Sequence, residues 1–362
     1  MQSSFNNFKS LHIIRGLCAL IVLIYHSKFV LWSGGNLYIK EKGVNNFFDY
    51  IIFGIDMLSS CGNQCVLLFF VLSGFVIYFS FNNSNKKLGH FYIIRVLRIY
   101  LPYLFSLFFG IITLYIIVKL NSNIAVEGIR EYNSRLLLAY NDLCISSVLK
   151  ALLFMQSKEY AGFNFAYWSL FHEAIFYLAF PIYYFLGFRV RIIIFLLFIV
   201  VYYFLRTEVL YYQLYFLVGM FLYDYYKTSR KLVAQKNFYI LILVLSFVST
   251  NLFVKMGYRY FADFSALIVI TVAFDYIIIN GIKKNKYLIK LADMSYSLYL
   301  NHLAVLMICY SIFNKLLNKV IFFERYPYYL GVIVSLVLCY VFYFFIEKKS
   351  LILISKIKEK WS

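Results

Sequence analysis

Runs of roughly 20 apolar residues follow one another along almost the whole sequence, and each run is long enough to cross the hydrocarbon core of a bilayer as a helix. A segment in lipid must satisfy its backbone hydrogen bonds internally, which favours helices. Hydrophobic residues make up 63% of the chain and charged residues only 14%, a composition that excludes an ordinary soluble protein. The sequence therefore predicts an all-α polytopic membrane protein.

About ten helices of this kind are predicted, and an even number places both termini on one side of the membrane. Lysine and arginine are more frequent in the loops on that side than in the longer loops on the opposite side. Cytoplasmic loops are enriched in basic residues, so both termini are predicted to be cytoplasmic. The predicted spans are residues 11–31, 64–82, 100–119, 166–187, 190–206, 209–226, 237–254, 259–280, 294–313 and 328–347.

The chain carries a formal net charge of +19. Its basic residues lie between the apolar runs, not in a patch with interleaved aromatic residues, so they indicate orientation in a membrane and no nucleic-acid partner. We predict one transmembrane domain, 1–347, and a basic cytoplasmic tail, 348–362, lying near anionic lipid. Two long outer loops, 32–63 and 120–165, can cover a cavity, and 148–155 fits a re-entrant or an interfacial helix.

The six cysteines are scattered along the chain. Cys61 and Cys65 have no companion pair of histidines or cysteines, so no metal site is predicted. A disulfide from either of them to Cys144 is one alternative, and free thiols are the other.

The first predicted span contains two ionisable residues, Arg15 and His26. Their spacing of 11 residues leaves about 20° beyond three full helical turns and a rise of about 16.5 Å, so both side chains share one face at different depths. An ionisable residue inside a membrane helix costs roughly 2.5–3.5 kcal/mol on insertion scales. A span that keeps two of them on one face is expected to direct that face at something polar.

Glu173 is the predicted partner of His26. The span 166–187 runs inward, which puts Glu173 about 7.5 Å below Trp168 and at a depth similar to that of His26. A carboxylate beside a histidine orients the ring and stabilises the imidazolium, as a general base requires. The alternative is a structural polar pair that joins two helices. His172 points about 100° away from Glu173 and is predicted to be a bystander.

Arg95 and Arg98 lie three residues apart and share a helix face. They are placed on a basic segment just before a span, and Tyr100-Leu101-Pro102 is expected to break the helix there. Together with Arg15 they can bind the phosphates of a cytoplasmic ligand, because guanidinium groups match phosphate oxygens. The alternative is ordinary anchoring of a cytoplasmic loop.

Two further patterns lie inside spans. Ser73-Gly74 consists of small residues at mid-membrane, which allow close helix approach, the default interpretation, or line a narrow passage. Tyr296, Tyr299 and His302 recur at a spacing of three, as expected for one helix face. A lone buried histidine is usually a hydrogen-bonded core residue, so catalysis by His302 is the less favoured alternative. The candidate lining of a pore or acceptor site is Ser73, Trp168, Ser169, Tyr296, Tyr299 and His302.

Five motifs follow one another along the chain. They are Arg15-x10-His26, Phe69-Phe70-Val71-Leu72-Ser73-Gly74-Phe75, Arg95-x2-Arg98, Trp168-Ser169-Leu170-x2-Glu173 with Phe176-Tyr177-Leu178, and Ser295-Tyr296-Ser297-Leu298-Tyr299-Leu300-x-His302. In this order, these motifs resemble the membrane acyltransferase-3 family, which includes O-acetyltransferases of O-antigen, exopolysaccharide and other surface polysaccharides. The resemblance spans nearly the whole chain. Two departures are His12-Ile13, where the family usually has Asp-Gly, and Glu347-Lys348-Lys349, which lacks the proline of a common Glu-x-Pro.

The resemblance implies ten core helices and an acyl donor, usually acetyl-CoA, that arrives from the cytoplasm as a co-substrate with no permanently bound cofactor. It implies transfer to a sugar hydroxyl of a cell-surface or lipid-linked glycan at or beyond the outer face, in a bacterial cytoplasmic (inner) membrane. It also implies roles for Arg15, His26, Arg95 and Arg98. On this interpretation the arginines bind the donor, and His26 takes the proton from the acceptor hydroxyl as it attacks the thioester.

Three alternatives stay open beside direct transfer. A covalent acyl-enzyme on a serine, tyrosine or histidine is a second mechanism. A transporter or flippase of a glycan or lipid-linked substrate would use intramembrane ionisable residues as a path. A member of the family without activity would act only as a binding partner, which the presence of Arg15, His26 and Glu173 disfavours.

Overall fold

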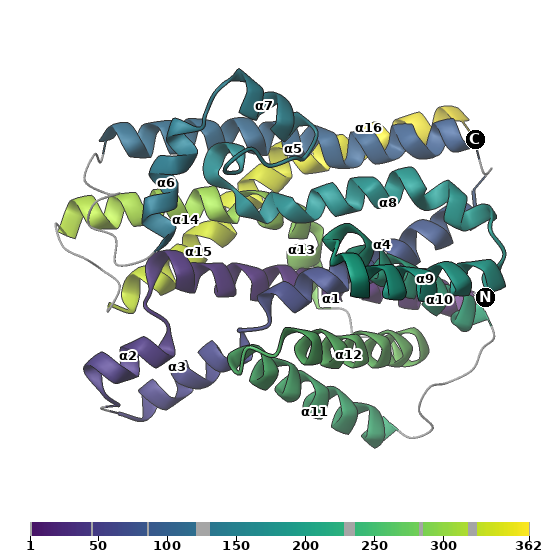
Figure 1. Cartoon of the computed structure of the whole chain (residues 1–362), viewed down its shortest axis with the longest axis horizontal. Coiled ribbons are helices and arrows are strands. Elements are labelled where there is room, and N and C mark those ends of the chain that lie inside the picture. Colours follow the sequence, from purple (N-terminus) through teal and green to yellow (C-terminus); the bar gives the residue numbers. More distant parts are fainter. Residues whose placement is uncertain are drawn as a thin grey trace. The chain divides into compact units, whose positions relative to one another are not determined.

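The computed structural model describes residues 2–44, 46–84, 87–120, 131–227, 236–281, 285–317 and 324–361. These residues are helical nearly throughout, and no strand occurs among them (Figure 1). The predicted all-α class is therefore confirmed. Part of the predicted outer loop 120–165, namely 121–130, lies outside the described residues.

Every predicted span corresponds to a helix, although several helices are longer than predicted. Eight helical segments are long and apolar enough to cross a membrane. Helices α8 and α10 are not among them, because tyrosines and ionisable residues lower their hydropathy. The count of about ten spans and the cytoplasmic side of the termini stay predictions. The long helices are α1 (Gln2–Leu31), α4 (Gly62–Asn82), α5 (Leu88–Leu120), α8 (Trp168–Phe185), α9 (Phe188–Leu205), α10 (Glu208–Lys227), α11 (Lys236–Lys255), α12 (Arg259–Asn280), α14 (Ser295–Leu317) and α15 (Tyr326–Phe342).

The chain divides into two compact units, and α1, α5 and α8 each contribute residues to both. The first unit contains α4, α9, α10, α11, α12 and the short α13 (Lys286–Asp293); the second contains α14, α15 and the shorter helices described below. The first unit comprises Met1–Cys18, Ser60–Ile93 and His172–Asp293. The second unit comprises Ala19–Ser59, Ile94–Phe171 and Met294–Ser362.

In the first unit, α4 and α10 pack backbone against backbone. A Cβ added to Gly74 would lie 2.1 Å from the carbonyl oxygen of Phe216, and one added to Gly219 would lie 2.1 Å from the carbonyl oxygen of Val71. Such distances leave room only for glycine. Close helix approach is therefore the role of Gly74, as one of the two sequence alternatives predicted. Figure 1 shows α11 and α12 side by side in the same unit.

The second unit is built around α14, the most deeply buried of the candidate spans. Tyr103 of α5 donates a hydrogen bond to the carbonyl oxygen of Ala151 (2.6 Å), and Tyr100 donates to that of Leu152 (2.7 Å). These contacts attach α7 (Ile145–Leu152), the helix predicted near 148–155, to α5. The short α6 (Glu131–Asn141) precedes α7, and the turns η2 (Ala161–Phe163) and η3 (Phe165–Tyr167) lead into α8.

The predicted break at Pro102 is wrong. Helix α5 begins at Leu88 and continues through Pro102, so Arg95 and Arg98 lie within the helix and not on a segment before it. Proline removes one backbone N–H and one helical hydrogen bond. Helices among other helices in a membrane tolerate that loss, because neighbouring groups and small adjustments satisfy the freed carbonyl.

The segments flanking the spans are also helical. The predicted outer loop 32–63 contains α2 (Gly35–Lys42) and α3 (Phe47–Leu58). After α15 a π-helical turn, η4 (Tyr343–Glu347), leads directly into α16 (Lys348–Trp361), which forms the predicted tail. All six cysteines are free thiols, so neither Cys61 nor Cys65 is bonded to Cys144 in the structure.

Candidate functional site

Two histidines form a buried pair in the second unit. Nδ1 of His26, on α1, lies 2.7 Å from Nε2 of His302, on α14. The two ring planes are nearly parallel, at 9°. On its other side His302 places Nδ1 2.9 Å from the carbonyl oxygen of Leu298, one helical turn earlier. The ring of Phe165 packs nearly perpendicular to the ring of His26, with the centroids 5.1 Å apart.

This chain of contacts assigns the hydrogens of both rings. A carbonyl oxygen can only accept, so Nδ1 of His302 carries a hydrogen and donates it to Leu298. In a neutral ring Nε2 of His302 is then the acceptor, and Nδ1 of His26 is the donor to it. The lone pair of His26 is consequently on Nε2. A neutral imidazole held in that tautomer can accept a proton from a hydroxyl group.

Two of the predicted lining residues join one hydrogen-bonded group beside this pair. The hydroxyl of Tyr299 donates to the carbonyl oxygen of Ala166 at 2.8 Å. The hydroxyl of Ser169 lies 2.7 Å from the hydroxyl of Tyr299 and also donates to the carbonyl oxygen of Ala166, at 3.4 Å. The ring of Tyr299 lies 6.2 Å from that of His302, centroid to centroid. Ser169 and Tyr299 therefore connect α8 and α14 next to the histidines.

Buried polar groups fix the position of α14. Ser106 Oγ and Asn164 Nδ2 both donate to the carbonyl oxygen of Leu300, at 2.9 and 2.6 Å. At the start of the helix the backbone N–H and the hydroxyl of Ser297 both donate to Glu347 Oε2, the first at 3.0 Å. A carboxylate is stabilised near the N-terminus of a helix, where backbone N–H groups lack partners.

A sequence model that describes an acyltransferase domain matches residues 8–344, a range that contains both histidines and all the groups described above except Glu347. The chain belongs to the acyltransferase-3 family. Comparison with curated proteins and with solved structures gave no match. Membership of the family, together with the apolar helices, establishes a membrane acyltransferase.

In this acyltransferase Glu173 belongs to the first unit, whereas His26 belongs to the second. Ser73 Oγ donates to Glu173 Oε1 at 3.1 Å, and the Tyr177 hydroxyl donates to the same oxygen. His172 turns elsewhere, its ring centroid lying 4.5 Å from that of Tyr212. The pairing of Glu173 with His26 stays a prediction.

The predicted donor-binding arginines are also divided between the units. Arg15 belongs to the first unit, and Arg95 and Arg98 belong to the second. Arg95 is buried and Arg98 is partly buried, three residues apart on α5. Their predicted contact with the phosphates of a donor stays a prediction. No group of three or more histidine, cysteine or acidic side chains suited to a metal occurs in the described part of the chain.

The side chains on α14 that are spaced three residues apart do not contact the same neighbouring helix. They are Tyr296, Tyr299 and His302. The Tyr296 hydroxyl donates to the carbonyl oxygen of Ile99 on α5, at 2.9 Å. Tyr299 contacts the turn η3 and the first residues of α8, and His302 contacts α1. A spacing of three turns each successive side chain by about 60° about the axis, which separates the first from the third. Trp168 is the first residue of α8 and is partly buried.

The sequence did not reveal three of the groups that hold the histidines in place. Ser106 and Asn164 carry no pattern of their own, because each is an isolated polar residue among apolar ones, and Glu347 is distinguished in the sequence only as part of the motif that lacks its proline. Placing a polar side chain among apolar membrane helices costs free energy, so an isolated polar residue in such a segment is itself a sign that it has a role there. The histidine pair itself joins residues 276 positions apart, so spacing along one helix could not reveal it.

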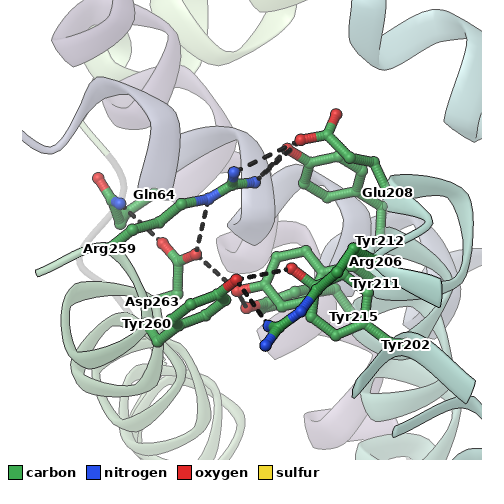
Figure 2. Close-up of polar contacts among 10 residues, drawn as sticks. All are labelled: Gln64, Tyr202, Arg206, Glu208, Tyr211, Tyr212, Tyr215, Arg259, Tyr260 and Asp263. Carbon is green, nitrogen blue, oxygen red and sulfur yellow. Dashed lines mark hydrogen bonds and ion pairs between the residues drawn. The ribbon is translucent and has the colours of Figure 1, made fainter. Parts of the chain in front are cut away.

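A second polar cluster lies in the first unit, where α12 begins (Figure 2). The Asp263 carboxylate accepts hydrogen bonds from Gln64 Nε2 (2.7 Å) and from the Tyr211 hydroxyl (2.6 Å). Arg259 Nη2 donates to the Tyr212 hydroxyl at 3.0 Å. These bonds join α4, α10 and α12, and the cluster contains none of the residues of the acyltransferase motifs. Polar side chains of this kind hold packed membrane helices together.

Proposed function

We propose that this acyltransferase transfers an acetyl group from cytoplasmic acetyl-CoA to a hydroxyl of a cell-surface or lipid-linked glycan, with His26 as the general base. The observation that carries the proposal is the hydrogen-bond chain from Leu298 through His302 to His26, because it leaves a lone pair on Nε2 of His26. A positioned base of this kind is what activation of a hydroxyl nucleophile requires.

The proposed reaction proceeds in one direct transfer. Nε2 of His26 takes the proton of the acceptor hydroxyl while the hydroxyl oxygen attacks the thioester carbonyl carbon. Collapse of the tetrahedral intermediate breaks the bond from carbon to sulfur, and the departing coenzyme A thiolate takes the proton back from Nε2. While His26 is an imidazolium, its hydrogen bond to His302 becomes charge-assisted and therefore stronger.

The substrates are proposed to reach this centre from opposite sides of a bacterial cytoplasmic membrane. Arg15, Arg95 and Arg98 would bind the phosphates of acyl-CoA on the cytoplasmic side, since guanidinium groups suit phosphate oxygens. Ser169 and Tyr299 would contact the acceptor, because hydroxyl groups can exchange their mutual hydrogen bond for bonds to a sugar. Glu173 as an additional group that orients His26 belongs to the same proposal.

A covalent acyl-enzyme and a transport function are the competing proposals. An acyl-enzyme would accumulate when donor is supplied without acceptor, and mass spectrometry of the intact protein would show the added acetyl group. A transporter would leave the thioester intact. Release of free coenzyme A by the purified protein therefore separates transferase from transporter.

The decisive experiment compares the wild-type protein with His26→Ala at equal expression, by mass spectrometry of surface glycans. His90→Ala is the matched control, because His90 lies in the first turn of α5 and outside the histidine pair. We expect the glycan to lose one acetyl mass in His26→Ala and to keep it in the control. Undiminished acetylation by His26→Ala would overturn the role of His26.

A further inference from the structure

Helix α3 turns its acidic residues inward and its apolar residues outward. Asp49 and Asp56 are seven residues apart, so they share one face, and both are almost fully buried. The opposite face is apolar and exposed. Its exposed side chains are Phe47 (73% exposed), Phe48 (69%), Tyr50, Ile51, Ile55 and Leu58. A helix in water has the reverse arrangement.

Two ion pairs hold the acidic face in place. Asp49 Oδ1 lies 2.5 Å from Arg325 Nη1, and Asp56 Oδ1 lies 2.8 Å from Lys28 Nζ. Lys28 also donates to the carbonyl oxygen of Asp56, at 2.9 Å. The backbone N–H of Gly35 donates to Asp56 Oδ2 at 3.3 Å. The apolar face is therefore outward because the acidic face is fixed, and not because α3 is loosely attached.

The same ion pairs set the level of α3 along the membrane-spanning helices. Lys28 lies in the last turn of α1, and Arg325 directly precedes α15. These two helix ends pack together, since a Cβ added to Gly331 would lie 2.1 Å from Leu31. Trp32 and Tyr328 extend this contact, with ring centroids 5.5 Å apart. Helix α3 thus lies at the end of two spans, where the hydrocarbon core of a bilayer gives way to its headgroups.

The neighbouring helix α2 shows the opposite polarity. Lys40, Glu41 and Lys42 of α2 are all exposed, as expected for a surface in water. Helices α2 and α3 contact each other, and Figure 1 shows them side by side. Two adjacent helices at one end of the spans therefore present one charged and one aromatic surface.

We infer that α3 is an interfacial helix whose exposed apolar face lies in the lipid bilayer, at the boundary between acyl chains and headgroups. Large aromatic and aliphatic side chains on one face are typical of helices lying in the membrane plane, about 5–10 Å into this boundary. Lipid is the occupant because the apolar face continues the lipid-facing surface of the spans: Phe29 of α1 and Leu330 of α15, close to the two ion pairs, are also exposed. The inference does not depend on the proposed reaction.

Fluorescence quenching in phosphatidylcholine nanodiscs tests this placement. Cys144 is the one exposed cysteine of the six, so Cys144→Ser provides a background in which an added cysteine can be labelled selectively. An NBD fluorophore is attached at Phe48→Cys or Ile51→Cys on α3, and at Glu41→Cys on α2 as the matched control. Size-exclusion chromatography verifies that each labelled protein is monodisperse.

The labels at 48 and 51 are expected to emit at shorter wavelength than the label at 41. They are expected to be quenched severalfold more by a lipid nitroxide near the headgroup than by one at the end of the acyl chain, and only weakly by aqueous iodide. Equal iodide quenching at 48, 51 and 41 would overturn the inference in favour of a water-exposed helix. Stronger quenching by the deep nitroxide would overturn it in favour of a re-entrant segment. Protection from both lipid nitroxides and iodide would overturn it in favour of a protein contact.

Discussion

Nδ1 of His26 donates a hydrogen bond to Nε2 of His302 across 2.7 Å, so one imidazole orients another. In many hydrolytic sites a carboxylate has this role and carries a negative charge. Here both partners are buried, and the carbonyl oxygen of Leu298 fixes the outer hydrogen. A neutral pair avoids the cost of placing an uncompensated charge among apolar helices.

Removing either histidine is expected to lower kcat and to leave the KM for acyl-CoA nearly unchanged, because neither histidine is proposed to bind the donor. The kcat of His26→Ala should fall by about 10²–10⁴-fold, the usual contribution of a general base. His302→Ala should lose less, since the base remains but its tautomer and orientation are no longer held. Release of coenzyme A by the purified protein with saturating acceptor measures both.

His302→Gln separates positioning from a merely structural effect. The side-chain oxygen of glutamine can still accept the hydrogen of Nδ1 of His26, so this variant should retain more activity than His302→Ala. A His302→Ala protein with wild-type kcat, or a His302→Gln protein no better than His302→Ala, would contradict the positioning role.

Cys144 is expected to react with thiol reagents faster and at lower pH than an ordinary thiol. Hydrogen bonds from the backbone and side chain of Ser147 lower the pKa of the Cys144 thiol, which caps the exposed start of α7. A lower pKa means that the reactive thiolate persists as the pH falls. The rate of labelling by a maleimide from pH 9 down to pH 6, with glutathione as the reference thiol, measures the shift.

The same cysteine tests the predicted orientation. The loop that contains Cys144 is predicted to be on the outer side, so a membrane-impermeant maleimide should label it in intact spheroplasts. Cys144→Ser should abolish this labelling, because the other five thiols are buried. Labelling that appears only after the membrane is permeabilised would reverse the orientation.

Gly219→Ala is expected to destabilise the protein. Its Cβ would lie 2.1 Å from the carbonyl oxygen of Val71 and 2.7 Å from the backbone nitrogen of Phe75, so α4 and α10 would have to separate. Overpacking of this kind costs about 1–3 kcal/mol or more. Thermal unfolding in detergent should show a lower midpoint. Gly89→Ala on α5 meets no atom within 4 Å and should leave the midpoint unchanged.

Glu347→Ala is expected to destabilise α14 and to reduce activity through the displaced His302. It leaves the N–H and the hydroxyl of Ser297 without their acceptor, at a cost of about 1–3 kcal/mol. Glu347→Gln keeps an acceptor oxygen and should recover part of the loss. Glu359→Ala, on the exposed side of α16, is the control for a lost surface carboxylate. Equal unfolding midpoints for Glu347→Ala and Glu359→Ala would contradict this role.

Sequence alone predicted the helices, because each apolar run is long and can be recognised within its own segment of the chain. It also singled out His26, because inserting an ionisable residue into a membrane costs free energy. For Gly74 it offered close helix approach and a narrow passage, and the structure shows the close approach. The error at Pro102 has a physical origin. The rule that proline ends a helix assumes that water competes for the freed carbonyl. A helix packed among other helices in a membrane can continue through the proline, as α5 does.

The partner of His26 could not be predicted in the same way. Pairing across 276 residues depends on how α1 and α14 pack, and nothing in either segment encodes it. Helix α3 was missed for a related reason. Asp49 and Asp56 interrupt its apolar run, and they look like solvent-facing residues until Arg325 and Lys28 are seen beside them.

The π-helical turn at η4 determines which face of the C-terminal helix α16 is turned toward the rest of the protein. A π turn contains one residue more than an α turn, and one residue corresponds to about 100° of rotation. The turn therefore rotates α16 relative to the apolar stripe of α15. In this phase Ser350 donates to the carbonyl oxygen of Leu97 and Ile354 is buried. Deleting a single residue of η4 would move both residues off that face and leave the helix continuous, so the attachment of this end of the chain depends on the number of residues in one turn.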